Sequence, residues 1–156
     1  MTDFSDLLRP DAVLTGLAVA SKKALFQQLA TTAALSVEGI DPALVAERLA
    51  AREKLGSTGF GGGVAIPHAK LPGLDVPVGI FARLAQPLSY QAVDDLPVDL
   101  VFALLSPEQA GSVHLKALAR VSRRLRDHGF LAKLRGAGSR DALFALFTTA
   151  ESRDAA

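Results

Sequence analysis

Three histidines, His68, His114 and His128, are the residues of this sequence best suited to nucleophilic or acid–base chemistry. His68 has the most informative surroundings. Five of the thirteen glycines lie at residues 56–63, and such a loop can turn its N–H groups toward one point to form an anion-binding concavity. Residues 64–66, Val-Ala-Ile, indicate a short buried strand, which Pro67 ends because proline has no N–H to donate. We therefore expect His68 at the end of a strand, beside a loop that binds anions.

The other two histidines differ from His68 in their surroundings. His114 falls in the first turn of a helix expected from about residue 112, after a buried strand, so it can reach the same edge of the sheet as His68. A helix N-terminus disfavours an added proton, which predicts a neutral imidazole that donates or accepts a hydrogen bond. His128 is expected at the C-terminal end of a helix, where a solvated cation is favoured over a functional role.

Several groups near His68 are suited to binding phosphate. Arg52 lies in the last turn of a helix expected over about residues 42–55 and is a candidate for positioning a phosphoryl group. Ser57, Thr58 and Gly59 lie in the glycine-rich loop, where hydroxyls bond the local backbone or a bound anion rather than act as nucleophiles. We predict that these three loop residues bind phosphate.

Together these residues fit a nucleophilic histidine. A neutral imidazole can take a phosphoryl group on one nitrogen while a partner holds the other, and amides, hydroxyls and a guanidinium stabilise the charge. A nucleotide-binding P-loop does not fit, because Gly63 is followed by Val-Ala-Ile rather than by lysine and a hydroxyl residue. A zinc site does not fit either, because no cluster of carboxylates or thiolates accompanies the histidines. We expect no cofactor and no metal.

Composition narrows the class of protein. With 156 residues, 49% hydrophobic and 21% charged, the chain is typical of a single globular domain over residues 1–156, ending in a frayed tail at about 150–156. A net charge of +1 gives no field that would attract nucleic acid or an anionic membrane surface. The absence of cysteine excludes disulfides and suits a reducing compartment. The sequence has neither a signal peptide nor an apolar run of roughly 20 residues, so we expect a soluble cytoplasmic protein without membrane insertion.

Periodic patterns predict helices on either side of a group of strands. Helices are expected at about 22–38, 42–55, from 112, at 130–134 and after Ser139, with Leu55 and Leu115 facing inward. An edge strand is expected at 12–14 and strands at 78–84, 88–93 and 98–105, the last two joined as a hairpin by the turn 94–97. This order predicts an α/β fold with a mixed central β-sheet flanked by helices on both faces.

The motif residues resemble a known family. Arg52, the run Gly-Ser-Thr-Gly-Phe-Gly at 56–61 and the run Val-Ala-Ile-Pro-His at 64–68 resemble the active-site signature of the phosphotransferase-system enzyme IIA proteins of the fructose/mannitol and nitrogen-regulatory type. Residues 97–105 and His114 with the helix after it resemble that family's later strand and second-histidine helix. Two positions depart from the family pattern: Ala69 stands where glycine often follows the active histidine, and Gly62 where nitrogen-type members often carry asparagine.

The resemblance implies that His68 is phosphorylated by an HPr-like or NPr-like phosphocarrier protein, that His114 forms a hydrogen bond at the active site and that Arg52 steadies the phosphoryl group. It also implies a mixed sheet flanked by helices. The nitrogen-regulatory type is favoured because no IIB or IIC portion is fused to the domain, and a free-standing fructose/mannitol-type IIA is the alternative. The partner is then either an EIIB component that accepts the phosphate or a transporter or sensor kinase regulated by it.

Overall fold

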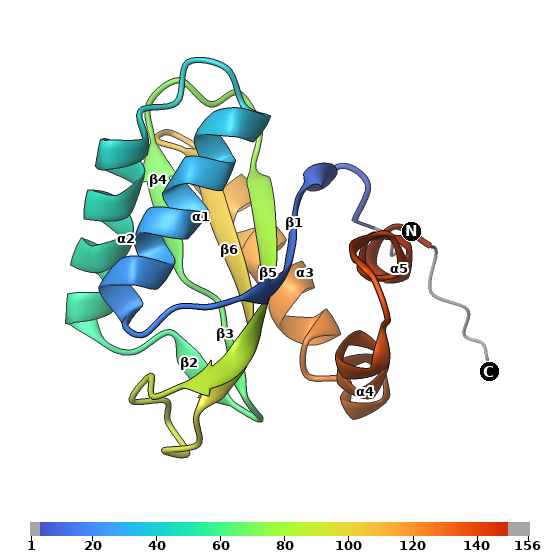
Figure 1. Ribbon diagram of the computed structural model, residues 1–156. Coiled ribbons are helices and arrows are strands. Elements are labelled where there is room, and N and C mark those ends of the chain that lie inside the picture. Colours follow the sequence, from blue (N-terminus) through green and yellow to red (C-terminus); the bar gives the residue numbers. More distant parts are fainter. Residues whose placement is uncertain (1–3, 150–156) are drawn as a thin grey trace.

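The computed structural model describes residues 4–149, in which six strands form one sheet (Figure 1). The strand order is β1-β5-β6-β3-β2, and β4 also pairs with β6. The strands are β1 (Leu8–Leu17), β2 (Gly59–Gly61), β3 (Val64–Ala65), β4 (His68–Leu71), β5 (Val78–Leu88) and β6 (Val98–Pro107). β1 is parallel to β5, β3 and β4 are parallel to β6, and the β5–β6 and β2–β3 pairs are antiparallel. The sheet is therefore mixed, as predicted.

Two groups of helices cover this sheet. α1 (Lys22–Ser36) and α2 (Pro42–Leu55) lie on one face, and α3 (Ser112–Arg124), α4 (His128–Gly136) and α5 (Arg140–Thr148) lie on the other (Figure 1). Local capping signals set the helix starts, since the side chains of Ser21, Asp41 and Ser139 each accept a bond from a first-turn N–H group. None of the helices within residues 4–149 is long and apolar enough to cross a membrane.

The core is centred on β6. Residues 100–105 of this strand are each at most 1% exposed. The ring of Phe147 on α5 lies between 4.8 and 5.9 Å from the rings of Phe4, Phe81 and Phe102. Gly79 of β5 must be glycine, because a Cβ there would lie 2.6 Å from ring atoms of Phe102. A tightly packed strand thus supports the residues at its end, where Ser106 is fully buried.

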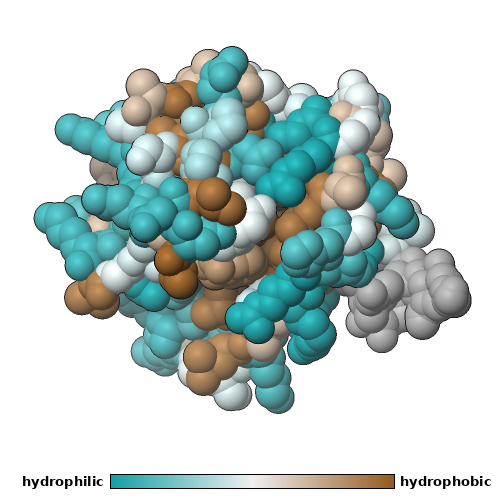
Figure 2. Space-filling model, turned by 90° about the horizontal axis from the view of Figure 1, so that it is seen from below, coloured by the Kyte–Doolittle hydropathy of each residue, from teal (hydrophilic) through white to brown (hydrophobic). Residues whose placement is uncertain are grey.

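The predicted strand at 88–93 is wrong. Leu88 ends β5, and residues 89–97 form an irregular connection to β6 in which Gln91 and Asp95 have φ of 60° and 61°. The chain leaves the sheet because Tyr90 turns inward, where it is fully buried and its hydroxyl lies 3.0 Å from Oγ1 of Thr58. Figure 2, seen from below, shows the end of the molecule that carries this connection, with apolar patches lying among hydrophilic side chains.

Two residues expected to face inward are exposed, Leu55 by 84% and Leu115 by 64%. Leu55 ends α2 on the side that borders the depression described below. In α3 the buried stripe consists of His114, Ala117 and Val121, so Leu115 falls outside it. His114 takes the inward position because its Nδ1 bonds the hydroxyl of Ser106. The predicted frayed tail, residues 150–156, lies outside the described residues.

Candidate functional site

His68 was expected at the end of the strand over residues 64–66, after Pro67, but it is the first residue of a separate strand, β4. β3 and β4 are two short strands that run parallel to the same strand, β6, and Ile66 and Pro67 separate them. Pro67 has no N–H to donate, but its carbonyl accepts the N–H of Leu104 at 2.9 Å. The chain therefore stays alongside β6, and His68 begins an edge strand of the sheet that pairs with β6.

Two hydrogen bonds fix the protonation of the His68 ring. Nδ1 lies 2.9 Å from the carbonyl oxygen of Ile66, which can only accept, so Nδ1 carries the proton. Nε2 accepts the Nε–H of Arg52 at 3.2 Å and therefore holds the lone pair. Burial lowers the pKa of His68, and the charge of Arg52 lowers it further, although the bond to Ile66 opposes them. The imidazole is neutral, with its lone pair on Nε2.

Arg52 and His114 both lie close to this ring. The Nη1 of Arg52 donates to the carbonyl of Gly56 at 2.9 Å, which holds the guanidinium beside Nε2. The His114 ring centroid lies 5.6 Å from that of His68, and its Nδ1 lies 2.7 Å from the hydroxyl of Ser106. Burial lowers the pKa of His114, and the nearby His68 and Lys70 lower it further. This direction agrees with the predicted neutral imidazole, and burial rather than the helix end is its main cause.

An open depression of about 600 Å³ surrounds the two histidines. Its lining contains three cations and no carboxylate, and consists of Arg48, Ala51, Arg52, Leu55, His68, Ala69, Lys70 and His114. One of the cations, Arg48, already pairs with Glu108 at 2.7 Å. The excess of positive charge suits a dianion such as a phosphoryl group. Among residues 4–149 no three His, Asp or Glu side chains are grouped to hold a metal ion.

Ser57, Thr58 and Gly59 do not line this depression. The N–H and hydroxyl of Thr58 both donate to Glu53, at 3.1 and 2.6 Å, and the N–H of Gly59 donates to the hydroxyl of Ser57 at 3.1 Å. These groups have partners within the protein, so their phosphate-binding role stays a prediction.

The rest of the glycine-rich loop forms the turn between β2 and β3. Gly61, Gly62 and Gly63 have φ of 109°, 69° and 82°, which side chains rarely adopt. The N–H of Gly62 donates to Asp94 at 3.0 Å, and its carbonyl accepts from Arg135 at 2.8 Å. The glycines are needed for a tight turn held by two side chains, and the structure gives no support to an anion-binding concavity there.

Two functional candidates were not found from the sequence. Glu53 has a side chain only 7% exposed, yet it accepts bonds from Lys22 at 2.8 Å and from both donors of Thr58. Burial alone would raise the pKa of Glu53, but the bonds from Lys22 and Thr58 outweigh it and hold the pKa below its ordinary value. Ser106 is the other candidate. The sequence contained a signal for it, because Ser106 is a lone hydroxyl residue at the end of an apolar strand.

His128 was expected at the C-terminal end of a helix, and this is wrong. It is the first residue of α4, after the capping residue Asp127, whose side chain accepts the N–H groups of Gly129 and Phe130. Sequence analysis did not identify Asp127 as a capping residue. Because Asp127 caps α4, the helix begins at His128. The imidazole is exposed and does not line the depression around His68.

The chain is similar to known proteins over most of its length. The family model for the EIIA 2 domain of the phosphoenolpyruvate-dependent sugar phosphotransferase system matches residues 6–150. A nitrogen regulatory protein of Bradyrhizobium diazoefficiens is 49% identical over 142 residues, which cover 91% of this chain and 92% of that protein. The crystal structure of the nitrogen regulatory protein IIA-Ntr from Neisseria meningitidis aligns with a TM-score of 0.85 and 35% identity, over 92% of this chain and 97% of that one.

A more distant structure shares the fold. It is the Escherichia coli mannitol enzyme IIA in complex with phosphorylated mannitol enzyme IIB, with a TM-score of 0.72 and 18% identity over 90% of this chain and 98% of that one. The family match extends over nearly all of the described residues, and it includes both histidines and the arginine that the fold brings together. The chain belongs to the EIIA 2 family of the phosphoenolpyruvate-dependent sugar phosphotransferase system.

Proposed function

We propose that the protein accepts a phosphoryl group on Nε2 of His68 from a phosphocarrier protein of the HPr or NPr type. The observation that carries the proposal is the pair of hydrogen bonds on this ring, from Nδ1 to the Ile66 carbonyl and from Arg52 to Nε2. They leave one nitrogen with a lone pair, next to a guanidinium and within a cationic depression. A preorganised nucleophile and a positioned positive charge are the main requirements of phosphoryl transfer.

In the transfer step, the Nε–H of Arg52 releases Nε2 of His68, and the Nε2 lone pair attacks phosphorus while the phosphorus–nitrogen bond of the carrier's phosphohistidine breaks. The carrier's imidazole leaves with the electron pair of that bond. The proton stays on Nδ1, which donates it in a hydrogen bond to the Ile66 carbonyl, so no proton has to move on this side of the reaction. The incoming group adds roughly two negative charges. Arg52 can pair with its oxygens, and His114, held by Ser106, is the second candidate for a hydrogen bond to them.

We infer that this chemistry serves regulation of the nitrogen-regulatory type. The 49% identity to a nitrogen regulatory protein over most of both chains supports this assignment. A phosphohistidine at an exposed depression would change the charge that a partner meets, which is enough to alter the preference of an interface for a transporter or a sensor kinase. The alternative is transfer onward to a IIB sugar-transport component, which the fold shared with a mannitol IIA found with phosphorylated IIB supports.

The phosphorylation test uses the purified protein with enzyme I, an HPr-type or NPr-type carrier and phosphoenolpyruvate. We expect one acid-labile phosphate, located by peptide mass analysis on His68. His68→Ala should abolish it, whereas His128→Ala, which removes an exposed histidine away from the depression, should leave it intact. Labelling of the His68→Ala protein would contradict the assignment.

A second test separates the two roles. The phosphorylated protein is mixed with purified IIB components, and transfer of the label is followed together with capture of partners by the phosphorylated and unphosphorylated forms. Efficient transfer to IIB would favour the sugar-transport role. Partners that exchange with phosphorylation, without a competent acceptor, would favour the regulatory role.

A further inference from the structure

Buried hydroxyl groups in this protein donate to a neighbouring acceptor. The buried polar residues within 4–149 include Thr32, Ser36, Thr58, Ser106 and His114. On α1, the hydroxyl of Thr32 donates to the carbonyl of Gln28 at 2.9 Å. The hydroxyl of Ser36 donates to the carboxylate of Asp11 at 3.3 Å. Each of these hydroxyls has an oxygen that can only accept beside it.

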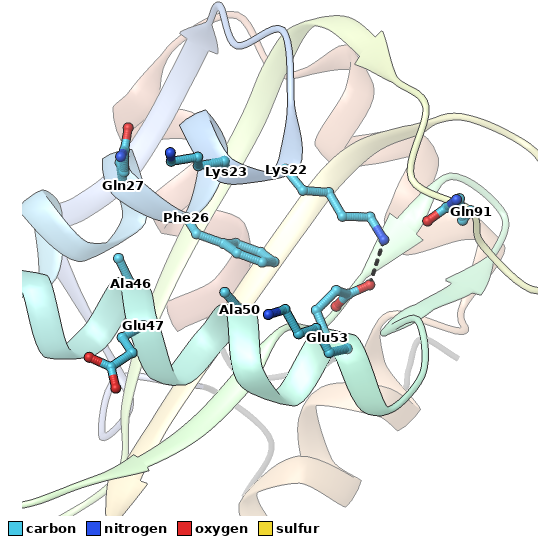
Figure 3. A pocket seen from close by; sticks show the side chains of 10 residues that line it. Lys22, Lys23, Phe26, Gln27, Ala46, Glu47, Ala50, Glu53 and Gln91 are labelled. Carbon is cyan, nitrogen blue, oxygen red and sulfur yellow. Dashed lines mark hydrogen bonds and ion pairs between the residues drawn. The ribbon is translucent and has the colours of Figure 1, made fainter.

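The same pairing holds where a charge is buried. The hydroxyl of Thr58 donates to one oxygen of Glu53 at 2.6 Å, and the ammonium of Lys22 donates to the other at 2.8 Å (Figure 3). A buried donor without an acceptor loses its hydrogen bond to water and gains none in return, so folded proteins seldom contain one. This rule can be used to place a proton that the heavy atoms alone do not locate.

The rule places the proton between Ser106 and His114. The Ser106 hydroxyl is fully buried, and its only partner in the described part of the chain is Nδ1 of His114 at 2.7 Å. If Nδ1 donated to the serine oxygen, the serine O–H would have no acceptor. If the serine O–H donates to a lone pair on Nδ1, both groups are satisfied, and this arrangement is favoured by roughly tenfold. Because burial keeps the ring of His114 neutral, its one proton is then on Nε2.

We propose that Ser106 is a positioning residue, which holds His114 so that its Nε2–H can donate to the phosphoryl group on His68. His114 is only 7% exposed and lines the depression around His68, yet within residues 4–149 its Nε2 has no partner. A charged phosphoryl oxygen is a strong acceptor for such an N–H group. The role in transfer rests on the function proposed for His68, whereas the tautomer of His114 does not.

The two histidines then have opposite tautomers. His68 has its proton on Nδ1, which donates to the Ile66 carbonyl, and its lone pair on Nε2. His114 has its lone pair on Nδ1, which accepts from Ser106, and its proton on Nε2. The group bound to Nδ1, a carbonyl in one ring and a hydroxyl in the other, decides between the two states. One imidazole therefore supplies an electron pair and the other a hydrogen bond.

The tautomers can be read from the full chain labelled with ¹⁵N in its histidine rings. Long-range proton–nitrogen correlation spectra at about pH 8, where the rings are neutral, distinguish a protonated ring nitrogen from one with a lone pair. We expect the proton on Nδ1 of His68 and on Nε2 of His114. The exposed ring of His128 is the control and should show an average of both tautomers. A proton on Nδ1 of His114 would overturn the proposal.

A rate experiment tests the positioning role. A glutamine at position 114 carries an N–H₂ group and needs no hydroxyl to fix its protons. Ser106→Ala should slow phosphoryl acceptance by roughly tenfold in the wild-type background, but by about twofold or less in the His114→Gln background. Ser36→Ala removes another buried hydroxyl, on α1, and should leave the rate unchanged.

Equal slowing by Ser106→Ala in both backgrounds would overturn the positioning role, because Ser106 would then act through packing alone. An unchanged rate in the wild-type background would overturn it as well. The spectra need neither a variant nor phosphorylation, so a wrong tautomer would sink this proposal alone. A protein with the assigned tautomers that takes no phosphate on His68 would instead sink the proposed function, and with it the role of Ser106 in transfer.

Discussion

Glu53→Gln should destabilise the protein by about 2 kcal/mol. The side chain is only 7% exposed and accepts a bond from Lys22 at 2.8 Å and one from the Thr58 hydroxyl at 2.6 Å. Bonds to a charged group contribute about 1.5–3 kcal/mol each, but glutamine keeps one acceptor oxygen for Thr58. The main loss is then the bond to Lys22, whose ammonium would face a neutral amide. For a domain of this size the melting temperature should fall by about 4–8 °C.

The assay is urea unfolding at neutral pH, with Glu47→Gln as the matched control. Glu47 lies on the same helix, is exposed and has no hydrogen bond or ion pair within residues 4–149, so its replacement should change stability by less than about 0.5 kcal/mol. A Glu53→Gln effect as small as that of the control would refute the reasoning.

The pH dependence of this difference is a second check. The pKa of Glu53 is lowered from its ordinary 4.5 in the folded state. Its contribution is therefore fully present above pH 4.5 and is lost as the pH falls through the lowered folded value. The gap in stability between the wild type and Glu53→Gln should close in that acid range. If the difference in stability between the two proteins stayed constant in this acid range, the shape of the side chain and not its charge would matter at this position.

Three further predictions concern the histidines. Arg52→Gln should slow phosphoryl acceptance by roughly ten- to a hundredfold without lowering the melting temperature. NMR titration of this variant should show a raised His68 pKa, because the Arg52 charge lowers that pKa in the wild type. An unchanged pKa would argue against the contact between Arg52 and His68. In rapid-quench assays the rate of acceptance should be constant above pH 6.5 and fall only below it, since the lowered pKa keeps Nε2 free of protons; a decline that begins at higher pH would contradict the assigned protonation. Ser106→Ala leaves Nδ1 of His114 without its buried partner, so it should cost about 1–3 kcal/mol in urea unfolding and shift the His114 ring ¹⁵N resonances; unaltered resonances would remove Ser106 from a positioning role.

Local signals made much of the fold predictable from the sequence. The bounds of α2 were predicted because Asp41 caps the helix, Pro42 begins it and Gly56 follows it. The strand predicted at 88–93 failed because the conformation there depends on distant partners. Tyr90 reaches Thr58 and Glu53, which precede it by 32 and 37 residues, and no periodic pattern contains that information.

Within the candidate site, the residues suited to phosphoryl transfer could be predicted from the sequence, but the residues that hold them in place could not. His68, Arg52 and His114 stood out by residue type and motif, and the fold brings them together. Glu53 did not stand out, since a glutamate in the last turn of a helix is normally solvated. Its burial arises only because the loop from residue 56 turns back over the end of α2. Leu55 was wrongly predicted to face inward, because a leucine beside an open depression can face solvent.

The parallel pairing of β4 with β6 also sets how long the backbone that carries His68 keeps its position. His68 lies opposite Leu104, 36 residues later in the chain, and the Leu104 N–H is bound to Pro67 in the most buried part of the sheet. β6 is a central strand, and such a strand opens only with the whole domain. The amide hydrogen of Leu104 should therefore be among the slowest to exchange with solvent. Nε2 can accept and release a phosphoryl group many times between two openings of this strand. On this fixed backbone, the hydrogen bond from Nδ1 to the Ile66 carbonyl presents Nε2 in every cycle, so each phosphohistidine formed would be the same isomer.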